Sequence, residues 1–310
     1  MPEHIPSLQE DLESLIRTTL RDVRSLSRVI PPALTSYGLD TFRGEGSVRR
    51  IARNVDTQKP IIYFDHGYGA NNFTQPILPL LANKGYEIYA FAKPFLYDIR
   101  RQAELSSKQL QKIAQQNSRN IVMLGHSMGG ITQAVIAKEI GLPSNVKKII
   151  SLASPYLGTL LACFGPGKSA RQMEPGNNLA LRLYQKDLPP GVELTCFVPT
   201  YDNVVSAESG LDHRAINILF ARYNHLSIIE SERVAFWIDH VIQKDHKHFE
   251  KYVTRRFFQP SLQRRLQRIV PPALRKRAGL VRMYEEFDRH EYPLILATQY
   301  ELESGFHPYA

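Results

Sequence analysis

The sequence has few cysteines, no long apolar run and no secretory leader pattern. Two cysteines, Cys163 and Cys196, are too few for a disulfide framework or a zinc knuckle. No apolar run approaches the roughly 18 residues that a membrane span requires. Acidic residues in the first 13 positions also argue against an organelle transit peptide. We expect a cytoplasmic protein, membrane-peripheral at most, with no signal peptide and no transmembrane segment; export by a route without a cleaved signal stays open.

The formal net charge of +9 is concentrated near the C-terminus. Between Lys247 and Arg282 the sequence has eleven cations and one anion, a net charge of +10, so the rest of the chain sums to −1. A basic body that coats nucleic acid is therefore not expected. Phe257 and Phe258 are the aromatic residues close to the cationic cluster, which gives RNA binding little support.

From residue 59 onward, short apolar runs alternate with longer helical periods. The expected strands are 61–64, 87–92, 120–125, 147–153, 193–198 and 215–220, and the expected helices lie near 74–84, 103–117, 128–140 and 230–243. Continuous apolar strands separated by helices indicate a mostly parallel central sheet with helices on both faces. The sequence thus predicts one α/β domain over residues 40–245.

Two arms flank this domain. Residues 1–39 are expected to form an N-terminal amphipathic helical arm, with a helix over 7–30 that Pro31-Pro32 ends. Residues 246–310 are expected to form a basic C-terminal extension. Its short amphipathic helix over 261–270 favours peripheral contact with anionic membrane through 247–282. The alternative is that its arginines pair with the acidic stretch that follows, Glu285, Glu286, Asp288 and Glu291.

The sharpest motif is GHSMGG, residues 125–130, which follows a predicted strand and opens a predicted helix. It contains the pattern G-x-S-x-G around Ser127. A serine hydroxyl is a poor nucleophile, so it must be held clear of the sheet and beside a base. The sharp strand-to-helix turn that does this strains the serine backbone and crowds Gly125 and Gly129, where only glycine fits.

These segments resemble the α/β-hydrolase superfamily, and specifically its lipase and esterase branch, including triacylglycerol lipases. DHGYG (65–69) is similar to the His-Gly oxyanion segment of lipases, SLASPYLGT (151–159) to their Ser-Pro-x-x-Gly-Thr stretch, and MEPGNNLALRL (173–183) to a piece of their lid region. The resemblance covers residues 60–230 and neither arm. It implies the α/β-hydrolase fold and an acyl-transferring serine.

A nucleophile elbow predicts its partners in the chain order Ser, then acid, then His. Asp202 follows a late apolar strand and opens an Asp-x-Val-Val pattern, and His225 lies in the loop after the last predicted strand. The backbone N–H of Met128 opens the helix after the nucleophile and is one expected oxyanion donor. By resemblance, Tyr68 supplies the second. The weaker candidates are Glu208, Asp212, His213, His240 and His126.

The segment 155–192 is longer than a simple crossover and carries apolar residues beside glycines, which favours a lid-like insertion over the site. The expected function is a carboxylic-ester hydrolase acting on an acyl-ester or lipid substrate. A thioesterase, phospholipase or acyltransferase would use the same triad, and a non-catalytic membrane- or RNA-binding scaffold is the alternative of another class. No metal or cofactor is predicted, since the histidine pair at 246 and 248 has no further ligands nearby. The sequence leaves the oligomeric state open.

Overall fold

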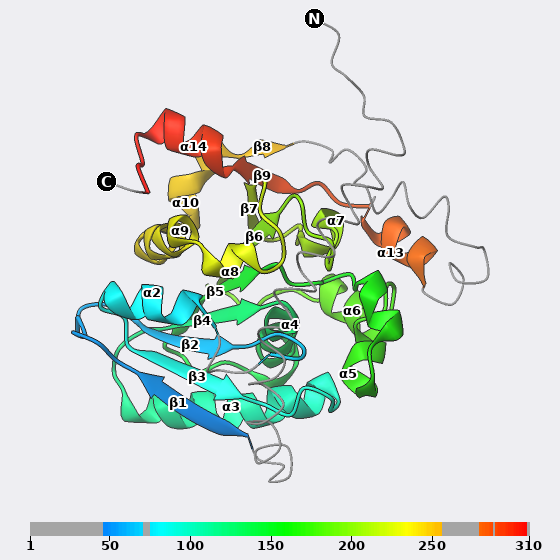
Figure 1. Cartoon of the computed structure of the whole chain (residues 1–310), viewed down its shortest axis with the longest axis horizontal. Coiled ribbons are helices and arrows are strands. Elements are labelled where there is room, and N and C mark those ends of the chain that lie inside the picture. Colours follow the sequence, from blue (N-terminus) through cyan, green and yellow to red (C-terminus); the bar gives the residue numbers. More distant parts are fainter. Residues whose placement is uncertain (1–45, 71–74, 256–278, 288, 309–310) are drawn as a thin grey trace, which may run out of the picture.

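The structure is a computed structural model that describes residues 46–70, 75–255, 279–287 and 289–308. The expected helix over 7–30 and the basic helix over 261–270 lie outside these residues. Over the described ranges the chain forms a nine-stranded sheet with the order β1-β3-β2-β4-β5-β6-β7-β9-β8 (Figure 1). Its strands are β1 (Ser47–Ile51), β2 (Ile61–Asp65), β3 (Ile88–Ala92), β4 (Ile121–His126), β5 (Val146–Leu152), β6 (Glu193–Pro199), β7 (Ile216–Phe220), β8 (Thr254–Arg255) and β9 (Pro293–Leu296).

The sheet is parallel from β3 through β9, and only the edge strands β1 and β8 run antiparallel to their neighbours. All six strands expected from the apolar runs are present, with each boundary within one residue of the expected one. This mostly parallel sheet confirms the predicted fold class. The sheet also continues past residue 245, where the expected α/β domain ends, because β9 pairs with β7 and β8 pairs with β9.

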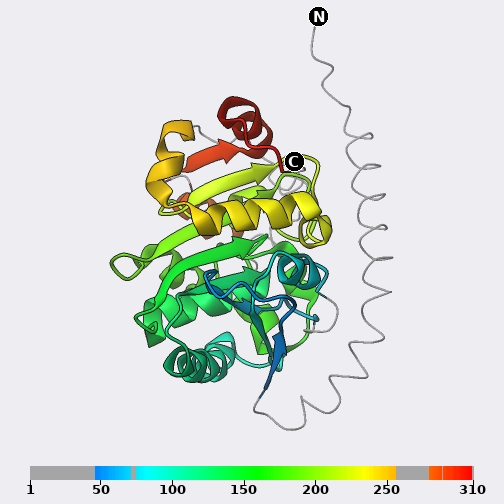
Figure 2. The ribbon, with the colours of Figure 1, turned by 90° about the vertical axis from the view of Figure 1, so that its left-hand side faces the viewer.

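Helices cover both faces of the sheet. The described helices and helical turns are α2 (Ile77–Asn83), α3 (Ile99–Gln116), α4 (Met128–Val135), η1 (Ile136–Ile140), η2 (Leu160–Phe164), α5 (Gly167–Gln172), α6 (Asn178–Gln185), α7 (Ala207–Gly210), α8 (Ser227–Glu230), α9 (Glu232–Gln243), α10 (His246–Phe249), η3 (Glu250–Tyr252), α13 (Leu280–Phe287) and α14 (Ala297–Ser304). In Figure 2, α9 lies across one face, where it packs against α2, while α3 and α4 pack together on the opposite face.

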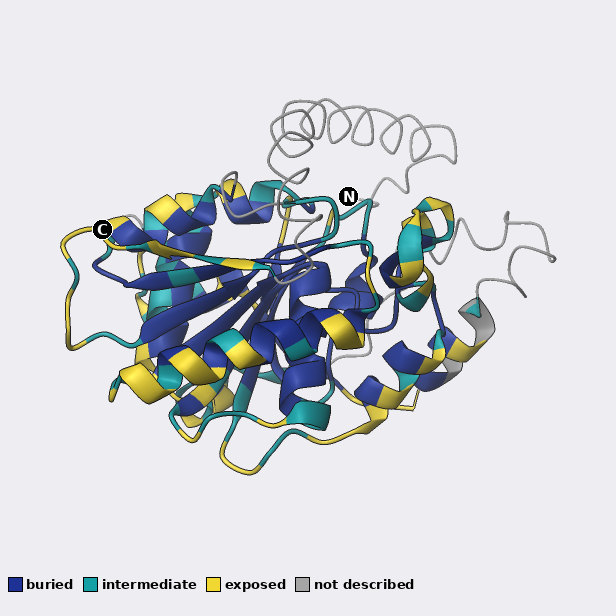
Figure 3. Ribbon diagram, turned by 90° about the horizontal axis from the view of Figure 1, so that it is seen from below, coloured by how far each residue is buried: buried dark blue, intermediate teal, exposed yellow. Residues whose placement is uncertain are grey.

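The period of two along each strand divides the core into two apolar layers. In β2, Ile61 and Tyr63 join the layer under α3 and α4, whereas Ile62 and Phe64 join the layer under α2 and α9. Both layers are removed from water, as the buried strands between helices with exposed outer surfaces show (Figure 3). A strand buried on both faces therefore reads as a continuous apolar run, which is why the sequence revealed these strands.

Three helical segments follow β5 before the chain returns to the sheet as β6. They are η2, α5 and α6, and they occupy half of the segment 155–192. Thr159 caps η2 and Asn177 caps α6, each through a side-chain oxygen that accepts a backbone N–H. Of the helices that the structure describes, none combines the length and apolar character that a bilayer span needs.

Candidate active site

Ser127 lies at a sharp turn between β4, which ends at His126, and α4, which begins at Met128. Its backbone has φ 53° and ψ −123°, a left-handed conformation that strains a residue with a Cβ atom. Gly129 packs against the end of β2, because a Cβ there would lie 2.0 Å from the carbonyl oxygen of Asp65. A Cβ on Gly125 would lie 2.6 Å from the backbone nitrogen of Gly130. The turn therefore requires glycine on both sides of the serine, as the motif predicts.

Asp202 and His225 meet at the carboxyl end of the sheet. Asp202 follows β6, His225 follows β7, and these two strands are neighbours in the parallel sheet. The His225 Nδ1 lies 2.8 Å from the Asp202 Oδ2. The other carboxylate oxygen, Oδ1, accepts the backbone N–H groups of Val204 and Val205, both at 2.8 Å. Because a carboxylate only accepts, His225 donates from Nδ1 and keeps Nε2 free to accept a proton.

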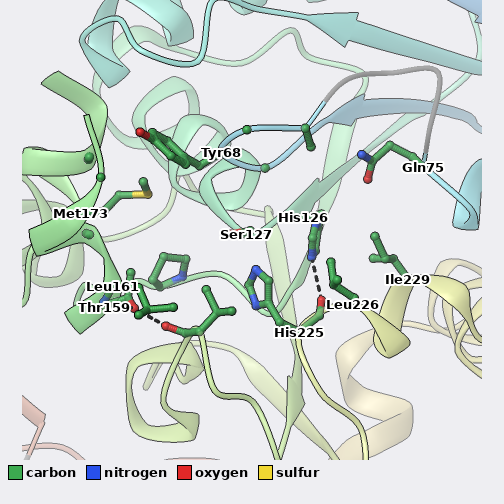
Figure 4. A pocket seen from close by; sticks show the side chains of 18 of the residues that line it. Tyr68, Gln75, His126, Ser127, Thr159, Leu161, Met173, His225, Leu226 and Ile229 are labelled. Atoms are coloured by element: carbon green, nitrogen blue, oxygen red, sulfur yellow. Dashed lines mark hydrogen bonds between the residues drawn. The ribbon is translucent and has the colours of Figure 1, made fainter. Parts of the chain in front are cut away.

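Ser127 and His225 both line one cavity of about 260 Å³ at this end of the sheet (Figure 4). Gly67, Tyr68 and Gly69 from the loop after β2 form one wall. The segment after β5 supplies a second, largely apolar wall through Pro155, Thr159, Leu161, Ala162, Gly165, Ala170 and Met173. The cavity therefore joins a hydroxyl, an imidazole and an apolar surface.

The two candidate oxyanion donors belong to segments next to the serine. A Cβ on Gly67 would lie 3.0 Å from the Cβ of Ser127, so the His66-Gly67-Tyr68 loop packs directly against the serine. Met128 is buried and opens α4, where the first backbone N–H groups of a helix lack partners within the helix. Of the five residues that the sequence singles out for the site, Tyr68, Ser127 and His225 thus line one cavity, Asp202 bonds to His225, and Met128 follows Ser127 in the chain.

His126 has a structural contact that sequence reasoning missed. Its Nε2 lies 3.1 Å from the main-chain oxygen of His225 (Figure 4). Burial, reinforced by the neighbouring His225, lowers the pKa of His126 to about 3, so its imidazole is neutral and donates from Nε2. The residue before the serine therefore fastens the loop that carries His225 to the elbow.

The weaker candidates lie in other environments. Asp212 is fully buried and pairs with Lys138 and Arg214. The ring of His213 stacks on that of His290, with centroids 3.8 Å apart. The other two, Glu208 in α7 and His240 in α9, are not among the residues that line the cavity, and His240 bonds to the hydroxyl of Tyr300.

The histidine pair at 246 and 248 forms hydrogen bonds with side chains of the protein. His246 Nε2 lies 3.2 Å from the Thr195 hydroxyl, and His248 Nε2 lies 3.0 Å from the Tyr300 hydroxyl. Over the described ranges, no group of three or more His, Cys, Asp or Glu side chains is arranged to hold a metal ion. In the acidic stretch after the basic segment, Glu286 bonds to Gln185, Arg289 and His290.

Two comparisons bear on the fold. Residues 53–163, which include β2 to β5 and the elbow but neither Asp202 nor His225, match the family described as PGAP1-like alpha/beta domain. The mature form of the Bacillus licheniformis lipase BlEst2 is 16% identical, with a TM-score of 0.54 over 59% of this chain and 93% of that one. Its propeptide form is 15% identical, with a TM-score of 0.57, and the match covers 64% of this chain and 54% of that one.

No curated protein matches the sequence. Identities of this size show a common fold. The protein therefore has the α/β-hydrolase fold, the architecture of a known lipase, and the resemblance read from the sequence is confirmed at that level.

Proposed function

We propose that the protein is a serine hydrolase that cleaves carboxylic esters through an acyl-enzyme on Ser127. The observation that carries the proposal is the 2.8 Å hydrogen bond from His225 to Asp202 beside a strained serine on the wall of the same cavity. A binding module has no need of a strained serine held between glycines, and this combination of nucleophile, base and acid is the one that acyl transfer requires.

In the proposed first step, Ser127 Oγ attacks the acyl carbonyl carbon while His225 Nε2 takes the hydroxyl proton. Asp202 holds the tautomer with Nδ1 protonated and stabilises the imidazolium. The C–O bond to the alcohol then breaks, the imidazolium returns its proton to the leaving oxygen, and the acyl group remains as an ester on Ser127. In the second step His225 deprotonates a water that attacks this ester, the bond from the acyl carbon to Ser127 Oγ breaks, and the imidazolium returns its proton to Oγ as the carboxylic acid leaves.

The negative oxygen of each tetrahedral intermediate needs donors already in place. We propose the backbone N–H groups of Tyr68 and Met128 for this role. The loop of Tyr68 packs on Ser127, and Met128 follows it at the start of α4. Removing one such donor costs roughly 10²–10³ in kcat, so the pair accounts for a large part of the rate enhancement.

We infer from the apolar wall that an uncharged acyl group of the substrate fills the cavity. Polar contacts there are few: Thr159 donates its hydroxyl to the main-chain oxygen of Val204 and so presents its methyl group. A cavity of about 260 Å³ is slightly smaller than the roughly 300–1,000 Å³ typical of ligand sites. We propose that η2 and α5 cover a single short or medium acyl chain, which makes residues 155–173 the acyl-binding part of the segment 155–192.

Labelling with a serine-directed fluorophosphonate tests the proposal. Wild-type protein is expected to become labelled with one equivalent, and Ser127→Ala is expected to remain unlabelled while unfolding at the same temperature. A panel of p-nitrophenyl esters from acetate to palmitate then gives the acyl preference. A properly folded wild type that takes no label and hydrolyses no ester in the panel would refute the proposal.

A further inference from the structure

A buried ion pair lies directly under the loop that carries Tyr68. Asp65 ends β2 and Lys93 follows the end of β3, and these strands are neighbours in the sheet (Figure 1). The Lys93 Nζ lies 3.1 Å from the Asp65 Oδ1, and both side chains are fully buried. Burying two charges costs several kcal/mol of desolvation for each ion, so such a pair is weak support for a role in stability alone.

The Asp65 carboxylate is fixed from three sides. Besides Lys93, it accepts the hydroxyl of Ser106 at 3.1 Å and the side-chain amide of Gln133 at 3.4 Å. Its main-chain carbonyl also supports the elbow, since it is the oxygen against which Gly129 packs. Asp65 therefore contacts both sides of the proposed site, the elbow and the oxyanion loop.

Lys93 also acts through its backbone. The Lys93 N–H donates to the Nε2 of His66 over 3.2 Å. Burial, followed by the charge of Lys93, lowers the pKa of His66 to about 3, so this ring carries a single proton. Because Nε2 accepts, the proton is on Nδ1, which donates to the main-chain oxygen of Gly67 over 2.8 Å.

The Gly67 carbonyl and the Tyr68 N–H belong to the same planar trans peptide and point in opposite directions. Holding the oxygen therefore aims the N–H. We infer that Lys93 and Asp65 are positioning residues for the oxyanion donor: the ion pair fixes the end of β3 against β2, and the Lys93 N–H fixes His66, which sets the peptide that presents the Tyr68 N–H. This inference rests on the proposed function.

The test replaces the pair by neutral side chains of the same shape, Asp65→Asn with Lys93→Met. Such replacements of buried pairs are often neutral for stability, so the fold is expected to survive. With p-nitrophenyl butyrate, kcat is expected to fall by about 10- to 100-fold, less than the loss of a whole donor, with KM within about two-fold. The inhibition constant of a trifluoromethyl ketone, whose adduct with serine carries an oxyanion, should rise by the same factor.

A control is a second buried Lys–Asp pair, Lys138 and Asp212, whose side chains are at most 1% exposed and which lines no part of the cavity, although Asp212 also pairs with Arg214. Asp212→Asn with Lys138→Met is expected to keep kcat and the inhibition constant of the ketone, whatever its effect on the unfolding temperature. If Lys93 and Asp65 act in stability alone, the folded protein with Asp65→Asn and Lys93→Met keeps its kcat and its inhibition constant for the ketone, as the control does, and that result would overturn the inference.

A second pair of variants keeps the inference testable if the first does not fold. His66→Asn retains a donor for the Gly67 oxygen, whereas His66→Phe retains none, so His66→Asn is expected to keep at least ten-fold more of kcat. Equal activities of these two variants would contradict the inference. Fluorophosphonate labelling of the wild type separates it from the proposed function: an unlabelled wild type overturns both, and a labelled wild type with unaffected variants overturns the positioning role alone.

Discussion

Replacing Asp202 by asparagine tests the proposed triad with the smallest change of shape. The Asp202 side chain is 1% exposed, and its two oxygens have separate tasks. Oδ1 accepts the N–H groups of Val204 and Val205, and Oδ2 accepts the Nδ1–H of His225. An asparagine has one oxygen and one NH₂ group, so only one of these tasks can be kept.

The two backbone donors decide which task survives. If the asparagine oxygen faces His225, its NH₂ group meets two N–H groups in a buried site, and three donors lack an acceptor. If the oxygen faces Val204 and Val205, the NH₂ group faces only the imidazole. The second orientation is favoured, and it forces His225 to accept at Nδ1 and to carry its proton on Nε2, where it cannot take the proton of Ser127.

A base held in the wrong tautomer costs about 10⁴ in kcat in a triad of this type, which corresponds to about 5 kcal/mol of barrier. We expect that loss for Asp202→Asn in the hydrolysis of p-nitrophenyl butyrate at pH 7, with little change in unfolding temperature. The control is Asp98→Asn, because Asp98 also accepts a backbone N–H, that of Arg100, and lies outside the cavity. A folded Asp202→Asn protein within ten-fold of wild-type kcat would refute the tautomer argument.

Three further predictions follow from the packing. Gly129→Ala places a Cβ 2.0 Å from the Asp65 carbonyl and should lower the unfolding temperature by about 4 °C or more and abolish labelling. The control is Gly210→Ala, whose Cβ lies 3.3 Å from a methyl group of Val198 and meets no backbone atom at that distance. Because the pKa of His126 is lowered to about 3 in the folded state, this group takes up a proton on unfolding at acid pH. As the pH falls from about 6.5 to about 4.5, this uptake should lower the free energy of unfolding by about 2–3 kcal/mol. In urea unfolding, His126→Gln should lose less stability over the same pH range, by about that amount. Ala162→Leu fills part of the cavity and should lower kcat/KM for p-nitrophenyl octanoate about ten-fold relative to acetate; an unchanged ratio would place the acyl chain elsewhere.

The central strands could be read from the sequence because their burial leaves a local signal. Both faces of β4 and β7 are covered, so every residue of these strands is buried and the runs are apolar apart from Asn217 and His126. The elbow is equally local, since the strained turn and its glycines occupy six consecutive residues. In this architecture the acid and then the base follow the serine along the chain, and this order led from the elbow to Asp202 and His225 as candidates.

The edges of the sheet left weaker signals. In β1 the sequence Ser-Val-Arg-Arg-Ile is exposed except for the half-buried Val48 and Ile51, so this edge strand is not a continuous apolar run. The partner of β9 is β7, more than 70 residues away along the chain, so no local pattern announces the pairing. Contacts such as those of Lys93 with Asp65 and His66 depend on which strands become neighbours in the sheet. No single segment of the sequence determines that strand order.

The C-terminal part of the chain, which we expected from the sequence to be one basic extension, has two components. Among the described residues, β9 pairs with β7, and α14 packs on α9 through Glu301, which bonds to Arg233 and Trp237. The loop of His225 lies between β7 and α9, so β9 and α14 support the elements that hold the proposed base. Seven of the eleven cations between Lys247 and Arg282, by contrast, fall in residues 256–278. Truncation at residue 245 would remove β9 together with the positive charge of the basic segment. The role of this charge can therefore be tested separately from the fold only by substituting the cations.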